Sequence, residues 1–253
     1  MPFTASHTAI ILPLLRRRIF SASGLLMGSM VPDFEFFIRL QAQVIHGHSF
    51  WAMFWLNIPL AVLCITLYHL VVRDKMILNL PLYFRERFEP FLSFDWISYL
   101  KSNYVKVIYS ILIGNLSHLL WDSFTHFNGF VVTKITFLNM EFWQIPLYDI
   151  LQYGFSVLGA IAILNYIAKM PSLKIEKHFS KKGTISYWFL VVCLTMLTYF
   201  LRYDKSVPED FGAQIVFICA GFMIGLLVTS AGFSFLQSKN SIKLSQKYQT
   251  KKL

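Results

Sequence analysis

The amino-acid sequence predicts an all-α, multi-pass integral membrane protein. Of its 253 residues, 56% are hydrophobic and only 14% are charged, whereas soluble domains carry about 25% charged residues. The apolar residues gather into runs of about 20, the length at which a helix spans about 30 Å of hydrocarbon. We therefore expect a membrane-embedded helical bundle.

Apolar runs predict five clear transmembrane helices and one less regular segment. The five runs cover approximately residues 50–72, 107–127, 147–168, 185–202 and 212–236. Residues 19–40 are also apolar, but glycine, proline and charged residues interrupt them, so we expect a short, re-entrant or sixth spanning helix there. The predicted domains are a membrane-embedded domain with the candidate metal site at 1–168, a two-helix membrane hairpin at 169–236 and a basic cytoplasmic tail at 237–253.

Positive charge sets the predicted orientation. Segments 73–106, 169–184 and 238–253 hold 16 of the 23 lysines and arginines. Because these residues are enriched in cytoplasmic loops, we expect these segments, including the C-terminus, on the cytoplasmic side of the cell inner (plasma) membrane. The end of the 107–127 helix then lies on the extracytoplasmic side. The formal net charge of +10 is dispersed between apolar runs, which favours contact with anionic lipids over nucleic acid.

Three ionisable residues lie four residues apart near the end of the 107–127 run: His118, Asp122 and His126. On an α-helix this spacing stacks side chains along one face, with a drift of about 40° per step. A charge at the centre of a membrane helix costs roughly 2.5 to 3.5 kcal/mol, so a compensating interaction is expected. Metal coordination is the leading interpretation, and a proton relay or structural hydrogen bonding are the alternatives.

One helix cannot complete a metal site, because zinc normally takes four ligands. Candidate partners on the same predicted side are His7, Asp33 and His48. If they are ligands, their side chains should converge with His118 and Asp122 within about 5 Å of one point. The simpler interpretation of His7 and Asp33 is that they lie in the first turns of helices.

Other polar residues are predicted to support this site. Glu35, or His126 if it is not coordinated, is the expected general base. Asp149 and Gln152 are one turn apart and could orient a ligand imidazole, although helix-end polarity explains them equally well. The histidines expected to lie outside the ligand group are His46, His69 and His178.

The ligand types favour a hydrolytic metal. All three cysteines lie inside predicted spans, so neither a disulfide framework nor a thiolate site is indicated. Histidine and carboxylate ligands suit a divalent ion, with zinc first and manganese or iron as alternatives. This many ligands would also accommodate two neighbouring ions, with Asp122 as a terminal or bridging ligand.

Several motifs within about the first 160 residues carry a family resemblance. They are residues 1–7 (MPFTASH), 28–35 (GSMVPDFE), 48–49 (HS), 114–126 (GNLSHLLWDSFTH) and 151–152 (LQ). With them the chain resembles an uncharacterised family of bacterial multi-pass membrane proteins, a domain of unknown function related to YdjM-type membrane-bound metal-dependent hydrolases. The resemblance implies metal-dependent hydrolysis. The pair His118 and Asp122 is also distantly similar to the His-x-x-x-Asp ligand pairs of zinc-dependent phospholipases C.

We therefore expect an enzyme in which a metal-activated water attacks a phosphoester or similar bond of a lipid-borne substrate. The alternatives are a transporter or sensor that uses the same residues for metal ions or protons, and a non-catalytic membrane protein. A pathway needs polar groups across both halves of the bilayer, but residues 107–113 are nearly all apolar. A one-sided cluster favours the enzyme, with membrane lipids and their headgroups as partners.

Overall fold

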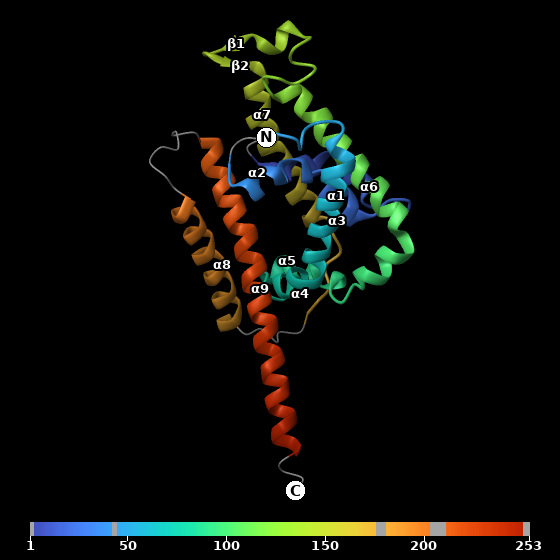
Figure 1. Ribbon diagram of the computed structural model, residues 1–253, viewed down its shortest axis with the longest axis vertical. Helices are drawn as coiled ribbons and strands as arrows, with labels where there is room; N and C mark the ends of the chain where they lie inside the picture. The colour runs from blue at the N-terminus through green and yellow to red at the C-terminus, as the bar shows by residue number, and fades with distance from the viewer. Residues whose placement is uncertain (1–2, 42–44, 176–180, 203–210, 250–253) are drawn as a thin grey trace. The chain divides into compact units, whose positions relative to one another are not determined.

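The computed structural model describes residues 3–41, 45–175, 181–202 and 211–249, and most of them are α-helical (Figure 1). His178 and the last residues of the predicted tail, 250–253, lie outside the described residues. The chain divides into two compact units. The first contains residues 1–66, 95–170 and 204–217, and the second contains residues 67–94, 171–203 and 218–253.

The longest helix of the first unit is α6 (Trp96–Thr125), with 30 residues. The Asp95 carboxylate caps its start by accepting a hydrogen bond from the backbone N–H of Ser98 at 3.0 Å. At the other end, His126 leaves the helix with an extended backbone. Inside α6 the backbone of Asn103 is non-helical, with φ −132° and ψ 24°, and kinks the helix. The predicted 107–127 span lies in the part of α6 that follows this kink.

Two glycines let α1 (Ala22–Gly28) approach α6 closely. A Cβ atom added to Gly114 of α6 would lie 2.5 Å from a carbonyl oxygen of α1, and Gly28 faces the backbone of α6 in the same way. Small residues at a helix crossing allow such backbone proximity. The crossing brings the carbonyl group of Ser29, just beyond α1, next to the ring of His118.

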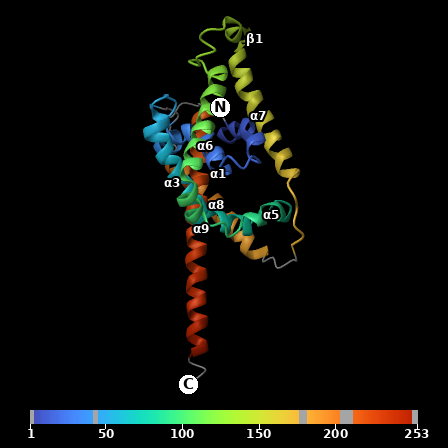
Figure 2. The ribbon, with the colours of Figure 1, turned by 90° about the vertical axis from the view of Figure 1, so that its right-hand side faces the viewer.

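The 3-10 helix η1 (Thr4–Leu14) lies between α6 and α7 (Leu147–Ala168), as Figure 2 shows. Gly159 of α7 provides the space, since a Cβ atom there would lie 2.7 Å from the Cβ of Ser6. The Ser6 hydroxyl donates a hydrogen bond to the carbonyl oxygen of Ser156 at 2.6 Å. These contacts seat the first turns of η1 inside the unit.

The segment 19–40 does not form one helix. It contains α1, the turn η2 (Val31–Asp33) and α2 (Phe34–Arg39), with seven, three and six residues. At about 1.5 Å per residue, none of them reaches the thickness of a bilayer core. Pro32 lies in the first turn of η2, and Leu40 ends α2 in the left-handed conformation. The structure therefore has the short form among the predicted alternatives.

Among the described residues, four helical stretches are long and apolar enough to cross a membrane, which indicates a membrane protein. They are Met53–Leu78, Leu147–Ala168, Lys182–Arg202 and Gly212–Leu236. They correspond to four of the five predicted spans. The remaining prediction, 107–127, lies in a helix whose apolar character is interrupted by Asn115, His118 and Asp122. The fifth span therefore stays a prediction, and residues 19–40 do not form a sixth spanning helix.

The stretch Met53–Leu78 passes from the first unit to the second. Its parts are the π-helical turn η3 (Met53–Asn57), α3 (Ile58–Leu67), the π-helical turn η4 (Tyr68–Val72) and α4 (Arg73–Leu78). Between α6 and α7 lie η6 (Thr136–Asn139) and an antiparallel hairpin of β1 (Glu141–Phe142) and β2 (Ile145–Pro146).

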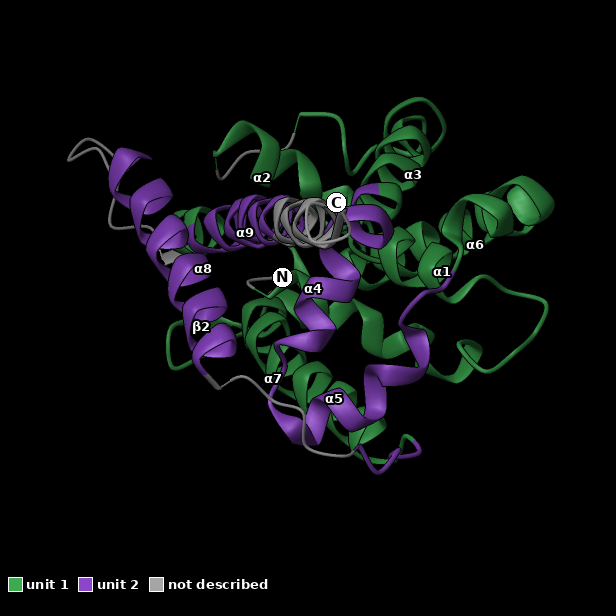
Figure 3. Ribbon diagram, turned by 90° about the horizontal axis from the view of Figure 1, so that it is seen from below, with its two compact units in different colours: residues 1–66, 95–170, 204–217 green, residues 67–94, 171–203, 218–253 purple. Residues whose placement is uncertain are grey.

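The second unit is the region shown in purple in Figure 3. Its further helices are α5 (Leu82–Phe88), η5 (Glu89–Phe91), α8 (Lys181–Arg202) and most of α9 (Phe211–Gln249). The hydroxyl groups of Tyr187 and Ser230 share a hydrogen bond of 2.9 Å between α8 and α9. Gly221 of α9 packs against the backbone of Thr195.

Replacing Gly114 tests the close crossing of α1 and α6. We expect Gly114→Ala to lower the free energy of unfolding by about 1 to 3 kcal/mol, because the added methyl group forces the two backbones apart. Gly154→Ala is the matched control, since an added Cβ there meets nothing within 4 Å. Thermal unfolding of both variants in detergent measures the difference. Equal stability of the two variants would contradict the crossing.

Candidate metal centre

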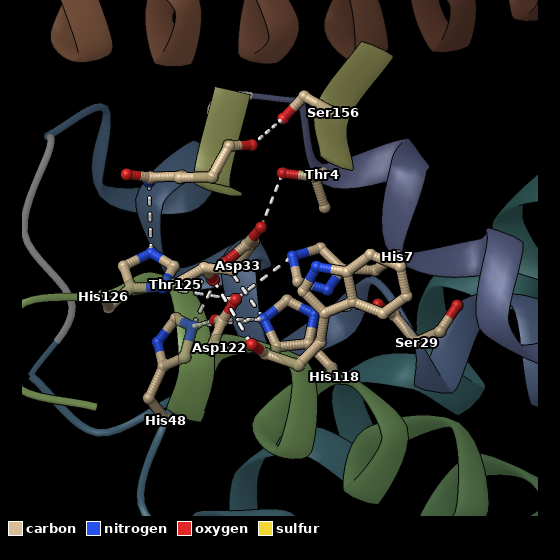
Figure 4. Close-up of polar contacts among 12 residues, drawn as sticks. Thr4, His7, Ser29, Asp33, His48, His118, Asp122, Thr125, His126 and Ser156 are labelled. Carbon is tan, nitrogen blue, oxygen red and sulfur yellow. Dashed lines mark hydrogen bonds and ion pairs between the residues drawn. The ribbon is translucent and has the colours of Figure 1, made fainter. Parts of the chain in front are cut away.

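Four ionisable side chains converge in the first unit (Figure 4). Asp33 comes from η2, His48 from the loop after α2, and His118 and Asp122 from one face of α6. One ligand atom from each residue lies within 4.8 Å of the other three. The structure therefore brings together four of the five residues that the sequence predicts as metal ligands.

Five of the six distances among the four ligand atoms are 3.0 to 3.4 Å, and the sixth, between the two carboxylate oxygens, is at most 4.8 Å. The Nε2 atom of His118 lies 3.0 Å from Asp122 Oδ2 and 3.4 Å from Asp33 Oδ1. The Nε2 atom of His48 lies 3.1 Å and 3.3 Å from the same two oxygens, and 3.2 Å from His118 Nε2. Ligands at about 2.0–2.1 Å from a tetrahedral zinc are about 3.3 Å apart. The donor set and these separations could therefore hold a metal ion.

The site concentrates negative charge away from water. Asp33 is 2% exposed and Asp122 is 6% exposed, while His118 is fully buried. Burial raises the pKa of Asp33, but the charge of His118 and hydrogen bonds from His118 and His48 outweigh burial and hold that pKa well below its usual value. Two buried carboxylates require compensating positive charge, which protons on histidine or a bound cation can supply.

Two hydrogen bonds from outside the four ligands fix their orientation. The Nδ1–H of His118 donates to the carbonyl oxygen of Ser29 at 2.8 Å, which leaves the Nε2 lone pair for a metal. The hydroxyl of Thr4 donates to Asp33 Oδ2 at 2.6 Å, so Oδ1 is the oxygen that faces the centre. Sequence analysis missed both partners: the first is a backbone group, and the second depends on where η1 packs.

Glu35 holds the loop that carries His48. Its two carboxylate oxygens accept hydrogen bonds of 2.7 to 3.1 Å from three consecutive backbone N–H groups, those of Ile45, His46 and Gly47. Burial alone would raise the pKa of Glu35. The three hydrogen bonds lower it by more than burial raises it, so the pKa lies below its usual value. The amide of Asn57 donates to the Gly47 carbonyl at 2.9 Å and secures the same loop. The geometry gives Glu35 a positioning role, and its role as general base stays a prediction.

His7 and His126 lie on the other side of the Asp122 carboxylate. His7 Nε2 and His126 Nδ1 are each 3.4 Å from Asp122 Oδ1. Gln152 of α7 reaches His126, with 3.4 Å between its Nε2 and the Nε2 of the ring, as expected for an orienting residue. Asp149, one turn earlier in α7, is partly buried.

The other histidines have different surroundings. His46 is exposed, and its ring meets the Trp55 ring edge to face at 5.5 Å. His69 belongs to the second unit, where its Nδ1 lies 3.0 Å from a guanidinium nitrogen of Arg73. Neither residue is among the four converging ligands.

An open pocket of about 720 Å³ borders the centre. The site residues His48, Asp122 and His126 line it, and the rest of its wall is largely apolar. The aromatic residues in that wall are Phe36, Phe50, Phe127 and Phe130. The centre is therefore accessible from one side, although His118 and Asp33 are buried.

Comparison with protein families identifies the family to which the chain belongs. A family model described as "Domain of unknown function (DUF4184)" matches residues 1–231. The chain belongs to this family. The match includes every residue of the candidate centre. No curated protein and no solved structure matches the chain.

Replacing Glu35 tests its positioning role. We expect Glu35→Gln to weaken zinc binding by about 10- to 100-fold, because an amide cannot anchor three backbone N–H groups as a carboxylate does. Titration of the detergent-purified protein with zinc measures this loss. Glu141→Gln, in the exposed strand β1, is the matched control. Unchanged zinc affinity in Glu35→Gln together with lost activity would contradict positioning and favour general-base catalysis.

Proposed function

We propose that this protein is an integral membrane metal-dependent hydrolase that acts on a phosphoester or similar bond in a lipid-borne substrate. The observation that carries the proposal is the convergence of two histidine nitrogens and two carboxylate oxygens beside an open pocket. Oxygen and nitrogen ligands of this kind are typical of hydrolytic zinc sites, with manganese or iron as alternatives. The same class is implied by the resemblance of the sequence motifs, such as residues 114–126, to membrane-bound metal-dependent hydrolases.

The ligand residues would supply the chemistry as follows. Asp33, His48, His118 and Asp122 would hold the cation, which would supply a bound water with a pKa near about 7 as the nucleophile. With four protein ligands, this water would be a fifth ligand of the ion. During hydrolysis the water oxygen bonds to phosphorus, the bond from phosphorus to the leaving oxygen breaks, and one water proton ends on that leaving oxygen. The buried carboxylates would hold the cation while these bonds form and break.

The surroundings of the pocket support a lipid-borne substrate. Phe50, Phe127 and Phe130 line the pocket and are 57%, 68% and 74% exposed. Exposed phenylalanine rings are suited to contact with the acyl chains of a lipid. A phosphoester headgroup in the pocket would lie beside His48 and Asp122, with its acyl chains among the aromatic rings.

The proposed location is the extracytoplasmic side of the inner membrane, with the C-terminus in the cytoplasm. The support is the distribution of lysine and arginine, of which 16 of 23 lie in the segments assigned to the cytoplasm. The pocket would then be reached from the outer leaflet.

Hydrolysis of vesicle phospholipids by the purified protein tests the proposal. We expect activity that chelation removes and zinc restores, and that Asp122→Asn lowers by at least about 100-fold, because this variant removes a ligand charge. Released phosphorylated headgroup is the measured product, and His46→Ala is the control. Hydrolysis that survives complete metal removal would contradict the proposal. Metal transport into vesicles without hydrolysis would also contradict it and favour a transporter.

A further inference from the structure

We propose that a second divalent cation binds beside the first, held by Asp122 Oδ1, His7 Nε2 and His126 Nδ1. The Asp122 carboxylate would then bridge two ions. This inference rests on the proposed function for its catalytic meaning, but the binding site itself is argued from geometry alone. It assigns His126 to metal binding in place of general-base catalysis.

The two oxygens of Asp122 face two different pairs of histidines. Oδ2 lies 3.1 Å from His48 Nε2 and 3.0 Å from His118 Nε2. Oδ1 lies 3.4 Å from both His7 Nε2 and His126 Nδ1. All four distances are near the separation of about 3.3 Å between ligands of one tetrahedral zinc. Each oxygen therefore has its own set of nitrogen ligands, as a bridging carboxylate requires.

The stacking of two imidazole rings sets the spacing of the two ions. The rings of His7 and His118 are nearly parallel, at an angle of 19°, and their centroids are 3.7 Å apart (Figure 4). Their Nε2 atoms approach different oxygens of the same carboxylate. Ions bound to these two lone pairs would be separated by about the ring spacing where both lone pairs point the same way. Ions in two-metal hydrolytic sites are about 3.5–4 Å apart, which agrees with this stack.

The environment of His7 also requires a partner. His7 is fully buried, and neither of its ring nitrogens makes a hydrogen bond to any part of the chain that the structure describes. A buried polar group without a hydrogen bond is costly. The stack on His118 does not use the nitrogen lone pair in the ring plane. A cation bound at Nε2 would use this lone pair. Packing against His118 alone does not explain why the nitrogen is buried without a hydrogen bond.

His126 completes the second site at its open side. Gln152 contacts its Nε2, so Nδ1 is the nitrogen turned toward Asp122. Its side chain is 37% exposed and lines the pocket. Three protein ligands leave a coordination position for water or substrate, as in catalytic zinc sites. Two divalent ions with two carboxylates give the centre a net positive charge, which would attract an anionic phosphoester.

Metal stoichiometry and magnetic coupling test this inference with Co²⁺ as the probe. The full-length protein in detergent is loaded with Co²⁺, desalted and analysed by elemental mass spectrometry and electron paramagnetic resonance. We expect about two ions per chain in the wild type, with spin coupling through the Asp122 bridge. His126→Ala should retain about one ion with an uncoupled signal. His7→Phe should do the same, since it keeps a ring against His118 but removes the ligand nitrogen.

The controls separate this inference from the proposed function. His46→Ala should retain both ions, because its exposed ring lies outside both ligand sets. One ion in the wild type with metal-dependent hydrolysis would overturn the second site and leave the proposed function standing. No bound metal would overturn both. Two coupled ions in His126→Ala would overturn the assignment of His126 as a ligand.

Discussion

The buried negative charge of Asp33 and Asp122 is the constraint on which the rest of the centre depends. These carboxylates are at most 6% exposed, and removing an ionised carboxylate from water is unfavourable unless it is paired. The side chains of His48 and His118 supply nitrogen partners for the inner oxygens at 3.0 to 3.4 Å. A cation bound by all four atoms would compensate both negative charges at once. Hydrogen bonds from the histidines compensate these charges only if the histidines stay protonated.

The fold places these side chains through backbone contacts. The glycine-mediated crossing of α1 and α6 delivers the Ser29 carbonyl to His118, and the Ser6 contact with α7 holds η1 so that Thr4 reaches Asp33. Glu35 and Asn57 fix the loop before the first apolar span. The α1–α6 crossing, η1 and the loop that carries His48 thus hold the ligand residues from three sides of the centre. The fourth side opens to the pocket, where a substrate can approach.

The residues of the centre were predicted from the sequence more accurately than the bounds of the surrounding helices. Spacing of four residues places His118 and Asp122 on one helical face whatever the tertiary structure, and the rarity of charge in apolar segments singled out Asp33. The supporting contacts could not be predicted in this way. The Ser29 carbonyl, for example, is a backbone group, so the residue type does not reveal its role. The part of α6 before the kink at Asn103 was not predicted, because it precedes the apolar run from which the 107–127 helix was inferred. Glu35 was predicted as a general base, and its hydrogen bonds to the loop at residues 45–47 could not be predicted because they depend on tertiary structure.

Anomalous X-ray scattering at the zinc edge, from crystals of the full-length protein grown with zinc, tests the central claim most directly. The account predicts a peak at about 2.0–2.2 Å from His48 Nε2, His118 Nε2 and the facing oxygens of Asp33 and Asp122. A fully ordered centre with no anomalous peak among these four atoms would contradict it. So would zinc bound only at other residues.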